Sequence, residues 1–145
     1  MIIEKYKEYR ITDLHVGMRE EFKYPITVDK LDAFLALIGD INPLHTDDAF
    51  AKAHGFKGRV AYGMLTASLI STLGGVLLPG KYCLIQGVEV KFSKPVFIGD
   101  ELTVIGEVGA VDIDLRYVEI KVTILNQDNK KVLRGLLKAG VLDEG

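Results

Sequence analysis

Cysteine and tryptophan are almost missing from this chain of 145 residues, which contains one cysteine and no tryptophan. The lone thiol of Cys83 can form no intramolecular disulfide and no cysteine-based metal cluster. A chain of this length can bury a core without such links, so one domain over residues 1–145 is expected. The scarcity of cysteine favours a reducing, cytoplasmic location. Cys83 lies among strand residues, where we expect a small apolar side chain rather than a nucleophile.

A strong charge imbalance and a membrane-length apolar run are also missing. The 20 acidic residues nearly balance the 18 basic ones, so no basic surface for nucleic acid or an anionic membrane is implied. The longest apolar stretch, residues 64–78, is interrupted by serine and threonine and is too short to span a bilayer. Residues 1–10 alternate charged and apolar side chains, unlike a signal peptide. We therefore expect no nucleic acid, no membrane and no export.

Common cofactor motifs are absent as well. Neither GxGxxG nor GxxxxGK[ST] occurs, so neither a dinucleotide fold nor a P-loop is supported. The three histidines, His15, His45 and His54, have spacings that match no zinc pattern. The sequence therefore predicts no metal and no cofactor, and packed or exposed roles for His15 and His54.

Helical periodicity marks the first half of the chain. Residues 27–39 place apolar side chains on one face, with Thr27 as a candidate N-cap and Gly39 as the left-handed residue that ends the helix. Because Pro43 pushes the preceding residue toward an extended conformation, residues 40–44 are expected to form a loop.

Two more helices are predicted after this loop. A short one is expected to begin at residues 46–48 and to end at Gly55. A second, over residues 64–73, carries apolar or small side chains on nearly every face and should be enclosed by the rest of the fold.

The second half of the chain alternates apolar and polar residues as strands do. Four strands are expected to follow the helices, and residues 19–26 are a candidate for one before them. The four segments lie around residues 88–92, 102–108, 118–124 and 131–142. An antiparallel sheet with one apolar face needs a cover, and the enclosed helix can supply it. The sequence thus predicts an α+β fold.

The segment GDINPLH, residues 39–45, carries the most chemistry. It places the Asp40 carboxylate and the His45 imidazole five positions apart on a short loop between helices, where the pair can hold one water molecule. Adding water across an activated double bond requires one group that removes a proton and one that delivers a proton, and an imidazole exchanges protons near neutral pH. A simple turn with Asn-Pro has the same sequence pattern, so spacing alone leaves both interpretations open.

The segment RVAYGML, residues 59–65, adds a second feature. Gly63 directly precedes the enclosed helix, whose first N–H groups have no partner within the helix. Such donors, at the positive end of the helix dipole, can polarise a thioester carbonyl and stabilise the enolate that forms on addition. Close backbone packing is the alternative reason for a glycine at this position.

Three linked segments resemble one known family. They are GDINPLHTD (39–47), VAYGML (60–65) and KFSKPVFIGD (91–100), and the resemblance extends over about residues 11–142 in the family's order and spacing. The family is that of the MaoC-like (R)-specific enoyl-CoA hydratases. The resemblance implies a hotdog fold, in which an antiparallel sheet wraps around a long central helix, and pairing into a homodimer or a higher homo-oligomer.

The resemblance also implies roles for particular residues. Asp40 and His45 would bind and activate water, and the N–H of Gly63 would meet the thioester oxygen of an acyl-CoA substrate. Asn42 would shape the loop and take part in the substrate site. Ser71, on the enclosed helix, matches a serine sometimes assigned to the active site, although a core serine bonded to its own helix is an equal alternative.

Substrate contacts are further expected from Tyr62 and Phe92. The sequence departs from the family at Tyr62, where many relatives have histidine, so the role of this position stays open. Phe92 belongs to the segment 91–99, which could line the acyl-CoA groove with Lys91 or Lys94 near the phosphates, or could be a strand end with solvated lysines.

Two alternative functions remain open at this stage. Hotdog proteins also include acyl-CoA thioesterases, which attack the carbonyl carbon instead of the alkene. The chain could also be a non-catalytic acyl-CoA sensor, although it has no DNA-binding segment and keeps both proton-transfer residues. Neither the preferred acyl chain length nor the pathway follows from the sequence.

Overall fold

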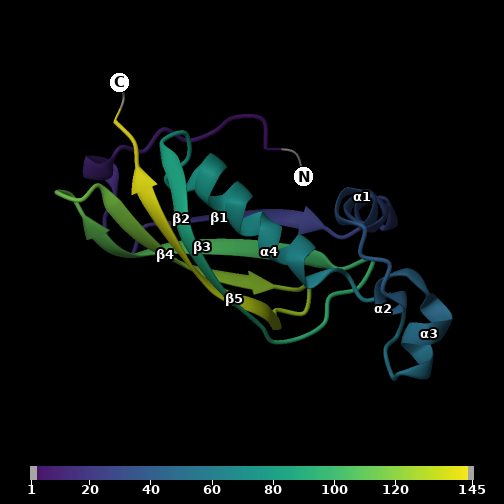
Figure 1. Cartoon of the computed structure of the whole chain (residues 1–145). Coiled ribbons are helices and arrows are strands. Elements are labelled where there is room, and N and C mark those ends of the chain that lie inside the picture. The colour runs from purple at the N-terminus through teal and green to yellow at the C-terminus, as the bar shows by residue number, and fades with distance from the viewer. Residues whose placement is uncertain (1–2, 144–145) are drawn as a thin grey trace.

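A five-stranded antiparallel sheet and a helix that lies against it form the body of the protein (Figure 1). The structure is a computed structural model that describes residues 3–143. The strands stand in the order β1-β3-β4-β5-β2. Their bounds are β1 Arg19–Pro25, β2 Cys83–Phe92, β3 Glu101–Asp112, β4 Tyr117–Leu125 and β5 Lys131–Val141. This arrangement confirms the predicted α+β hotdog fold and the candidate strand ahead of the helices.

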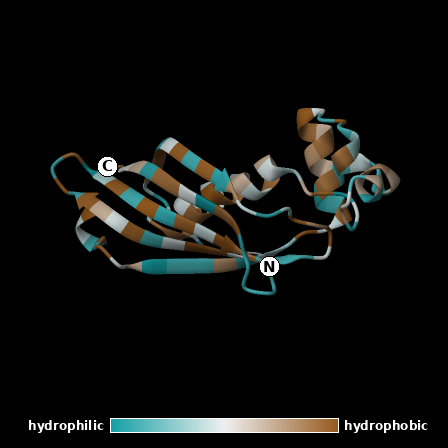
Figure 2. Ribbon diagram, turned by 90° about the horizontal axis from the view of Figure 1, so that it is seen from below, coloured by the Kyte–Doolittle hydropathy of each residue, from teal (hydrophilic) through white to brown (hydrophobic). Residues whose placement is uncertain are grey.

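Helix α4 (Gly63–Thr72) is the helix that packs on the sheet. Leu65, Leu69 and Ile70 of α4 are buried and join one core cluster with the inward-facing residues of the strands. The strands alternate buried and more exposed positions, and Figure 2 shows the matching alternation of hydropathy along them. Alternation with a period of two is what lets one face of the sheet bury apolar side chains against a helix.

The enclosure of α4 is incomplete, which corrects one expectation. Met64 is 64% exposed, and Ser71, seven residues later, is also exposed. The helix begins one residue earlier than predicted, at Gly63, and continues past Thr72 as a π-helical turn over Leu73–Leu77. One side of α4 therefore faces away from the sheet.

The small helices gather at one end of the sheet (Figures 1 and 2). Helix α1 (Val28–Ile38) begins and ends as predicted: Thr27 Oγ1 accepts the Lys30 N–H, and Gly39 adopts a left-handed conformation with φ 72°. A glycine reaches that conformation without the steric cost of a Cβ.

The segment after Gly39 differs from the prediction of a loop over residues 40–44. A single helical turn, α2 (Pro43–Thr46), begins inside it, because proline suits the first position of a helix and the Asn42 side chain accepts the Leu44 N–H. Helix α3 (Asp48–Ala53) follows with Asp47 as its N-cap. The predicted short helix thus begins within the expected residues 46–48 and ends at Ala53, two residues before Gly55.

Strand β2 is longer and more exposed than predicted. It begins at Cys83 instead of near Val88, and a register shift between Ile85 and Gly87 interrupts its pairing with β5. Among the described residues it has no strand on its outer side. Val88 is 45% exposed and Phe92 53%, so the apolar face predicted for this strand is only partly covered.

The helices within residues 3–143 are short compared with the thickness of a bilayer. In this part of the chain, none combines the length and the apolar character that crossing a membrane requires.

Candidate active site

Asp40 and His45 face each other across the turn that joins α1 to α2. His45 Nε2 lies 4.0 Å from Asp40 Oδ2. Two atoms at this separation can both contact one water molecule at a hydrogen-bond distance of about 2.8 Å. The side chain of His45 is 16% exposed and that of Asp40 is 45% exposed, so the pair lies where solvent and ligand can reach it. The structure therefore brings together the two residues predicted to activate water.

The second ring nitrogen of His45 is held by the backbone. His45 Nδ1 lies 2.7 Å from the carbonyl oxygen of Val60. Because a carbonyl oxygen can only accept a hydrogen bond, Nδ1 carries the proton. In the neutral ring, Nε2 then keeps a free lone pair on the side of Asp40. The fold thus fixes the tautomer that accepts a proton from water.

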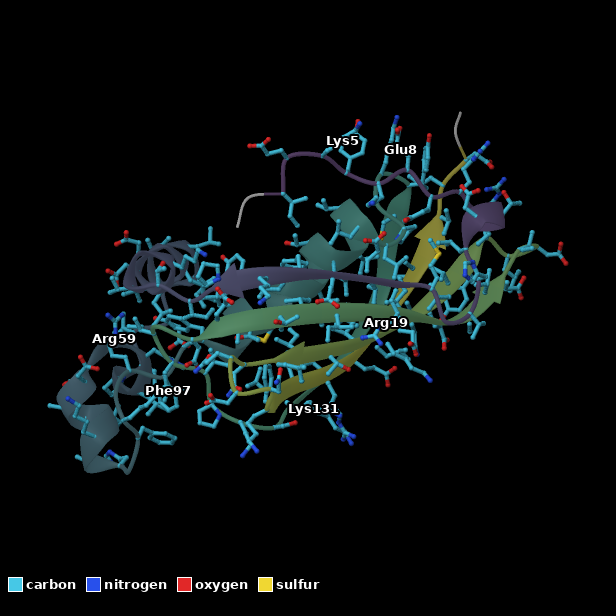
Figure 3. All side chains as sticks on the ribbon, turned by 180° about the vertical axis from the view of Figure 1, so that it is seen from behind. Lys5, Glu8, Arg19, Arg59, Phe97 and Lys131 are labelled. Carbon is cyan, nitrogen blue, oxygen red and sulfur yellow. The ribbon has the colours of Figure 1, made fainter. Side chains whose placement is uncertain are left out.

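Arg59 anchors the backbone of the same loop. Its Nε donates to the His45 carbonyl oxygen at 2.7 Å, and its guanidinium pairs with Asp32 of α1 at 3.2 Å. Figure 3 shows Arg59 at the helical end of the molecule, beside α1. A planar guanidinium with several donors can hold two segments at once. Arg59 therefore ties the turn that carries His45 to the preceding helix.

Tyr62 holds both members of the pair. Its hydroxyl donates to the backbone oxygen of Asp40 at 2.7 Å, and its ring stacks on the His45 ring with centroids 4.2 Å apart. Tyr62 is 2% exposed. Burial, and then the negative charge of Asp40, raise the pKa of Tyr62, so its hydroxyl stays protonated and remains a donor.

Gly63 places a helix N-terminus beside His45. It is the first residue of α4, and Tyr62, which precedes it, offers no side-chain cap within the described structure. Among the described residues, the N–H groups of Gly63 and Met64 have no acceptor, whereas the N–H of Leu65 donates to the Tyr62 carbonyl oxygen at 3.1 Å. A Cβ at Gly63 would lie 3.1 Å from Cε1 of Phe92, so the glycine also permits a close approach of that ring. Both roles weighed for Gly63, donor and close packing, are compatible with this geometry.

Two cavities meet at these residues. One of about 160 Å³ has Asp40, Tyr62 and Met64 in its lining. A larger one of about 310 Å³ has Thr66, Lys94 and Val132 in its lining. His45, Gly63 and Phe92 line both cavities. A linear molecule could therefore pass the Asp40–His45 pair with one arm in each cavity.

This arrangement can be compared with known proteins. The family model described as "MaoC like domain" matches residues 14–131. The chain belongs to the MaoC-like domain family. The protein named (R)-specific enoyl-CoA hydratase from Aeromonas caviae is 38% identical to this MaoC-like chain over 122 residues, which are 84% of this chain and 91% of that protein. The 3-hydroxybutyryl-CoA dehydratase of Methylorubrum extorquens is 35% identical over 111 residues, or 77% of this chain and 71% of that one.

Solved structures resemble this MaoC-like domain over nearly its whole length. The unliganded R-hydratase PhaJ1 from Pseudomonas aeruginosa superposes with a TM-score of 0.88 at 34% identity, covering 94% of this chain and 88% of that one. The (R)-hydratase from A. caviae, described as involved in PHA biosynthesis, gives a TM-score of 0.85 at 36% identity, with 89% and 98% covered. These matches confirm the family and the fold that the three sequence segments indicated.

Asn42 and Ser71 lie differently from the other predicted site residues. Asn42 acts inside the loop, where its side chain caps α2 and its N–H donates to Asp40 Oδ1 at 3.1 Å. Ser71 is exposed on α4, two helical turns beyond Gly63, and lies outside the linings of the two cavities described above. The alternative of a core serine is therefore wrong, and a role of Ser71 in the substrate site stays a prediction.

Lys91 and Cys83 lie outside the linings of the two cavities at the Asp40–His45 pair. Lys91 lines a groove on the sheet with Glu89 and Arg134. Cys83 is partly buried, and burial raises the pKa of its thiol to about 11, so it is protonated near neutral pH. Within residues 3–143, no group of three histidine, cysteine or acidic side chains could hold a metal ion. The expectation of no metal stays a prediction.

Arg59 and Thr66 were given no role from the sequence. Arg59 belongs to segment 59–65, but the two residues that its side chain contacts lie 14 and 27 positions away along the chain. Thr66 gave no signal, because a threonine in an apolar helix is common. The hydrogen bond from Tyr62 to Asp40 could not be predicted from the sequence either, since it joins residues 22 positions apart.

Proposed function

We propose that this MaoC-like protein is an (R)-specific enoyl-CoA hydratase, which adds water to trans-2-enoyl-CoA and, in reverse, dehydrates (R)-3-hydroxyacyl-CoA. The observation that carries the proposal is the 4.0 Å separation of His45 Nε2 and Asp40 Oδ2 beside the N-terminus of α4. The relatives named as hydratases and dehydratases support the same chemistry.

The reaction follows from the positions of the groups. A water molecule held between Asp40 and His45 attacks C3 of the enoyl thioester, and its proton passes to the pair as the new C–O bond forms. Electrons move from the C2=C3 double bond onto the thioester oxygen, where the N–H of Gly63 stabilises the enolate. The pair then returns one proton to C2. The net change is one hydrogen on C2 and one hydroxyl on C3, with no change in oxidation state overall.

The test measures hydration of crotonyl-CoA and longer trans-2-enoyl-CoAs, with chiral analysis of the 3-hydroxyacyl product. Asp40→Asn and His45→Gln keep the side-chain shape but remove proton transfer. We expect kcat to fall by about 100- to 10,000-fold with little change in KM, as for the loss of a general acid or base. Asp29→Asn and His54→Gln are matched controls, since both residues are exposed and lie outside the pair.

The alternative functions give different results in the same assay. Release of free CoA from saturated acyl-CoA, without hydration of enoyl-CoA, would favour a thioesterase. Tight binding of acyl-CoA without any turnover would favour a sensor. Either result, or an Asp40→Asn variant that keeps more than about a tenth of the wild-type kcat, would refute the proposed mechanism.

The active unit is proposed to be a homodimer whose sheets join through β2. Exposed apolar side chains gather on this edge strand, where Leu84 is 52% exposed and Ile85 39%. An open edge with apolar side chains is a template for pairing with another strand. A second copy offers the same edge, and a two-fold axis satisfies both edges at once. The cytoplasmic location expected from the single cysteine stays a prediction.

A further inference from the structure

Thr66 carries an unusual polar atom. It lies on α4 three residues after Gly63 and is 2% exposed. Its Oγ1 is the one buried side-chain nitrogen or oxygen that lacks a hydrogen-bond partner in the part of the chain the structure describes. A buried hydroxyl without a partner is unfavourable, and such groups are rare in folded proteins. A partner from outside the chain would remove this cost.

The surroundings of Thr66 show where such a partner would sit. Thr66 lines the larger cavity of about 310 Å³, together with His45 and Gly63 of the active site. Much of the remaining lining is apolar and includes Val60, Val96 and Val132. A ligand in this cavity therefore meets apolar walls and the buried Thr66 hydroxyl, which can both donate and accept a hydrogen bond, while the other hydroxyl of the lining, that of Ser93, is exposed to solvent.

The chemistry of a thioester substrate restricts which part of it can serve Thr66. This step rests on the proposed function. The reacting water already has Asp40 and His45 as partners, and the thioester oxygen has the helix N-terminus. A hydrocarbon acyl tail has no polar atom to offer. The pantetheine arm, on the other side of the thioester, does offer polar atoms, because it has an amide a few bonds beyond the sulfur.

Positively charged side chains beside the cavity lined by Thr66 also favour the pantetheine arm of CoA as its ligand. Exposed Lys94 belongs to the lining of the larger cavity and also to that of an adjoining cavity of about 250 Å³, which includes Lys57 and Phe97. Lys57 lies 4.0 Å from the Asp100 carboxylate and over the Phe97 ring, which Figure 3 places at the helical end near Arg59. Lys94 has no ion pair with any residue in the range 3–143. It is therefore available for an anionic group that follows the arm.

We propose that the cavity lined by Thr66 binds the pantetheine arm of the thioester, with the Thr66 hydroxyl bonded to an amide of that arm and Lys94 beside the phosphates of CoA. The smaller cavity, lined by Ile38 and Met64 on the other side of His45, then receives the acyl group. Thr66 is a substrate-binding residue in this arrangement, and proton transfer stays with Asp40 and His45.

Thr66→Val tests the hydroxyl directly, because valine has nearly the same shape without the polar atom. We expect the Kd for CoA in calorimetry and the KM for crotonyl-CoA and crotonyl-pantetheine to rise about 3- to 10-fold, the usual effect of one neutral hydrogen bond. The kcat should change less than about twofold, and Thr66→Ser, which keeps the hydroxyl, should bind like the wild type. The melting temperature of Thr66→Val should stay equal or increase, since an unpaired buried hydroxyl is removed.

Lys94→Glu tests the direction of the arm. The KM for crotonyl-CoA should rise about 10-fold or more at low salt, while the KM for crotonyl-pantetheine, which has no CoA phosphates, should stay unchanged. Lys91→Glu is the matched control, since Lys91 lines a different groove on the sheet.

Two results would overturn the proposal. They are wild-type affinity of Thr66→Val for CoA, and equal KM increases for both thioesters in Lys94→Glu. Calorimetry with CoA needs no turnover, so it separates this inference from the proposed reaction. A Thr66-dependent Kd in a protein that hydrates no enoyl-CoA would support the arm site and refute the hydratase.

Discussion

At the level of single residues, the proposed catalytic pair of Asp40 and His45 depends on neighbouring side chains that hold it in place. Tyr62 shows this most directly. The sequence predicts it as a substrate contact, and this stays a prediction, since Tyr62 lines the smaller cavity. Its hydroxyl also donates to the Asp40 carbonyl oxygen, and its ring stacks on that of His45. Phe34 of α1 also packs against the Tyr62 ring, at a centroid distance of 5.3 Å. We infer that Tyr62 is a positioning residue, which holds the carboxylate and the imidazole at a fixed separation.

Tyr62→Phe removes only the bond to the Asp40 backbone. We expect kcat to fall about 10-fold with KM nearly unchanged, because small displacements of reacting groups are costly while substrate contacts remain. Since the pKa of Tyr62 is raised above its usual value of 10.0, the hydroxyl is neutral throughout the assay range. The ratio of wild-type to variant kcat should therefore stay constant from about pH 6 to about pH 9.

Tyr117→Phe is the matched control for this prediction. The Tyr117 hydroxyl also donates a hydrogen bond, to Glu119 on β4, but it lies away from the catalytic pair. A ratio that changes with pH, or a Tyr62→Phe variant with full kcat, would show that the bond to Asp40 does not position the carboxylate.

At the level of the elements, the N-terminus of α4 is the proposed binding site of the thioester oxygen. A methyl group at Gly63 would meet the Phe92 ring at 3.1 Å, and that ring is 53% exposed and can move. The Gly63→Ala protein should therefore fold. Its Cβ and the displaced ring would occupy the junction of the two cavities, so kcat/KM should fall about 100-fold through misplacement of the thioester.

Gly75→Ala is a matched control on the same helical segment, since, apart from its chain neighbours and the backbone of its own helix, no heavy atom of the described residues lies within 4 Å of a Cβ built there. It should keep full activity. Melting temperatures and turnover are measured on both variants. A Gly63→Ala protein with a lowered melting temperature and intact kcat/KM would mean that the glycine serves packing alone and that the carbonyl binds elsewhere.

Elements that obey local rules were predicted correctly from the sequence. Helix α1 has its expected bounds because a threonine cap and a left-handed glycine act on their own neighbours. The prediction is incomplete at α2: Pro43 does hold Asn42 out of the helical conformation, but it also suits the first position of a helix, so a turn begins inside the predicted loop. The start of β2 was missed because an edge strand with half-exposed side chains lacks a clear alternation.

The sequence likewise predicts only part of the candidate site. The proximity of Asp40 and His45 could be predicted, since both lie on one short turn. The partners that fix them, Arg59 and Tyr62, reach the turn from the chain that leads into α4, and such contacts depend on packing. Thr66 could not be predicted either, because its unpaired hydroxyl exists only once the sheet covers that side of α4.

At the level of the whole molecule, the exposed edge connects the fold to the site. Phe92, at the end of β2, lines both cavities, and Met64, on the open side of α4, lines the smaller one. Both side chains are more than half exposed. A partner that covers β2 would therefore also cover part of the acyl path, so activity and pairing should be lost together.

Val88→Lys tests this link, because it places a charge in the middle of β2, where the native valine is 45% exposed. In an interface with two-fold symmetry the change occurs twice, and charges forced together at an interface cost several kcal/mol. We expect the dimer to weaken by about 100-fold or more. Sedimentation of the wild type should give twice the chain mass of 16.0 kDa, and the variant should sediment as a monomer with reduced kcat/KM at the same concentration.

Leu115→Lys is the control, since Leu115 is 75% exposed in the turn between β3 and β4 and its charge should leave the dimer and the activity unchanged. A wild-type chain that sediments as a fully active monomer would refute the link, because the open edge of β2 would then have no part in completing the site.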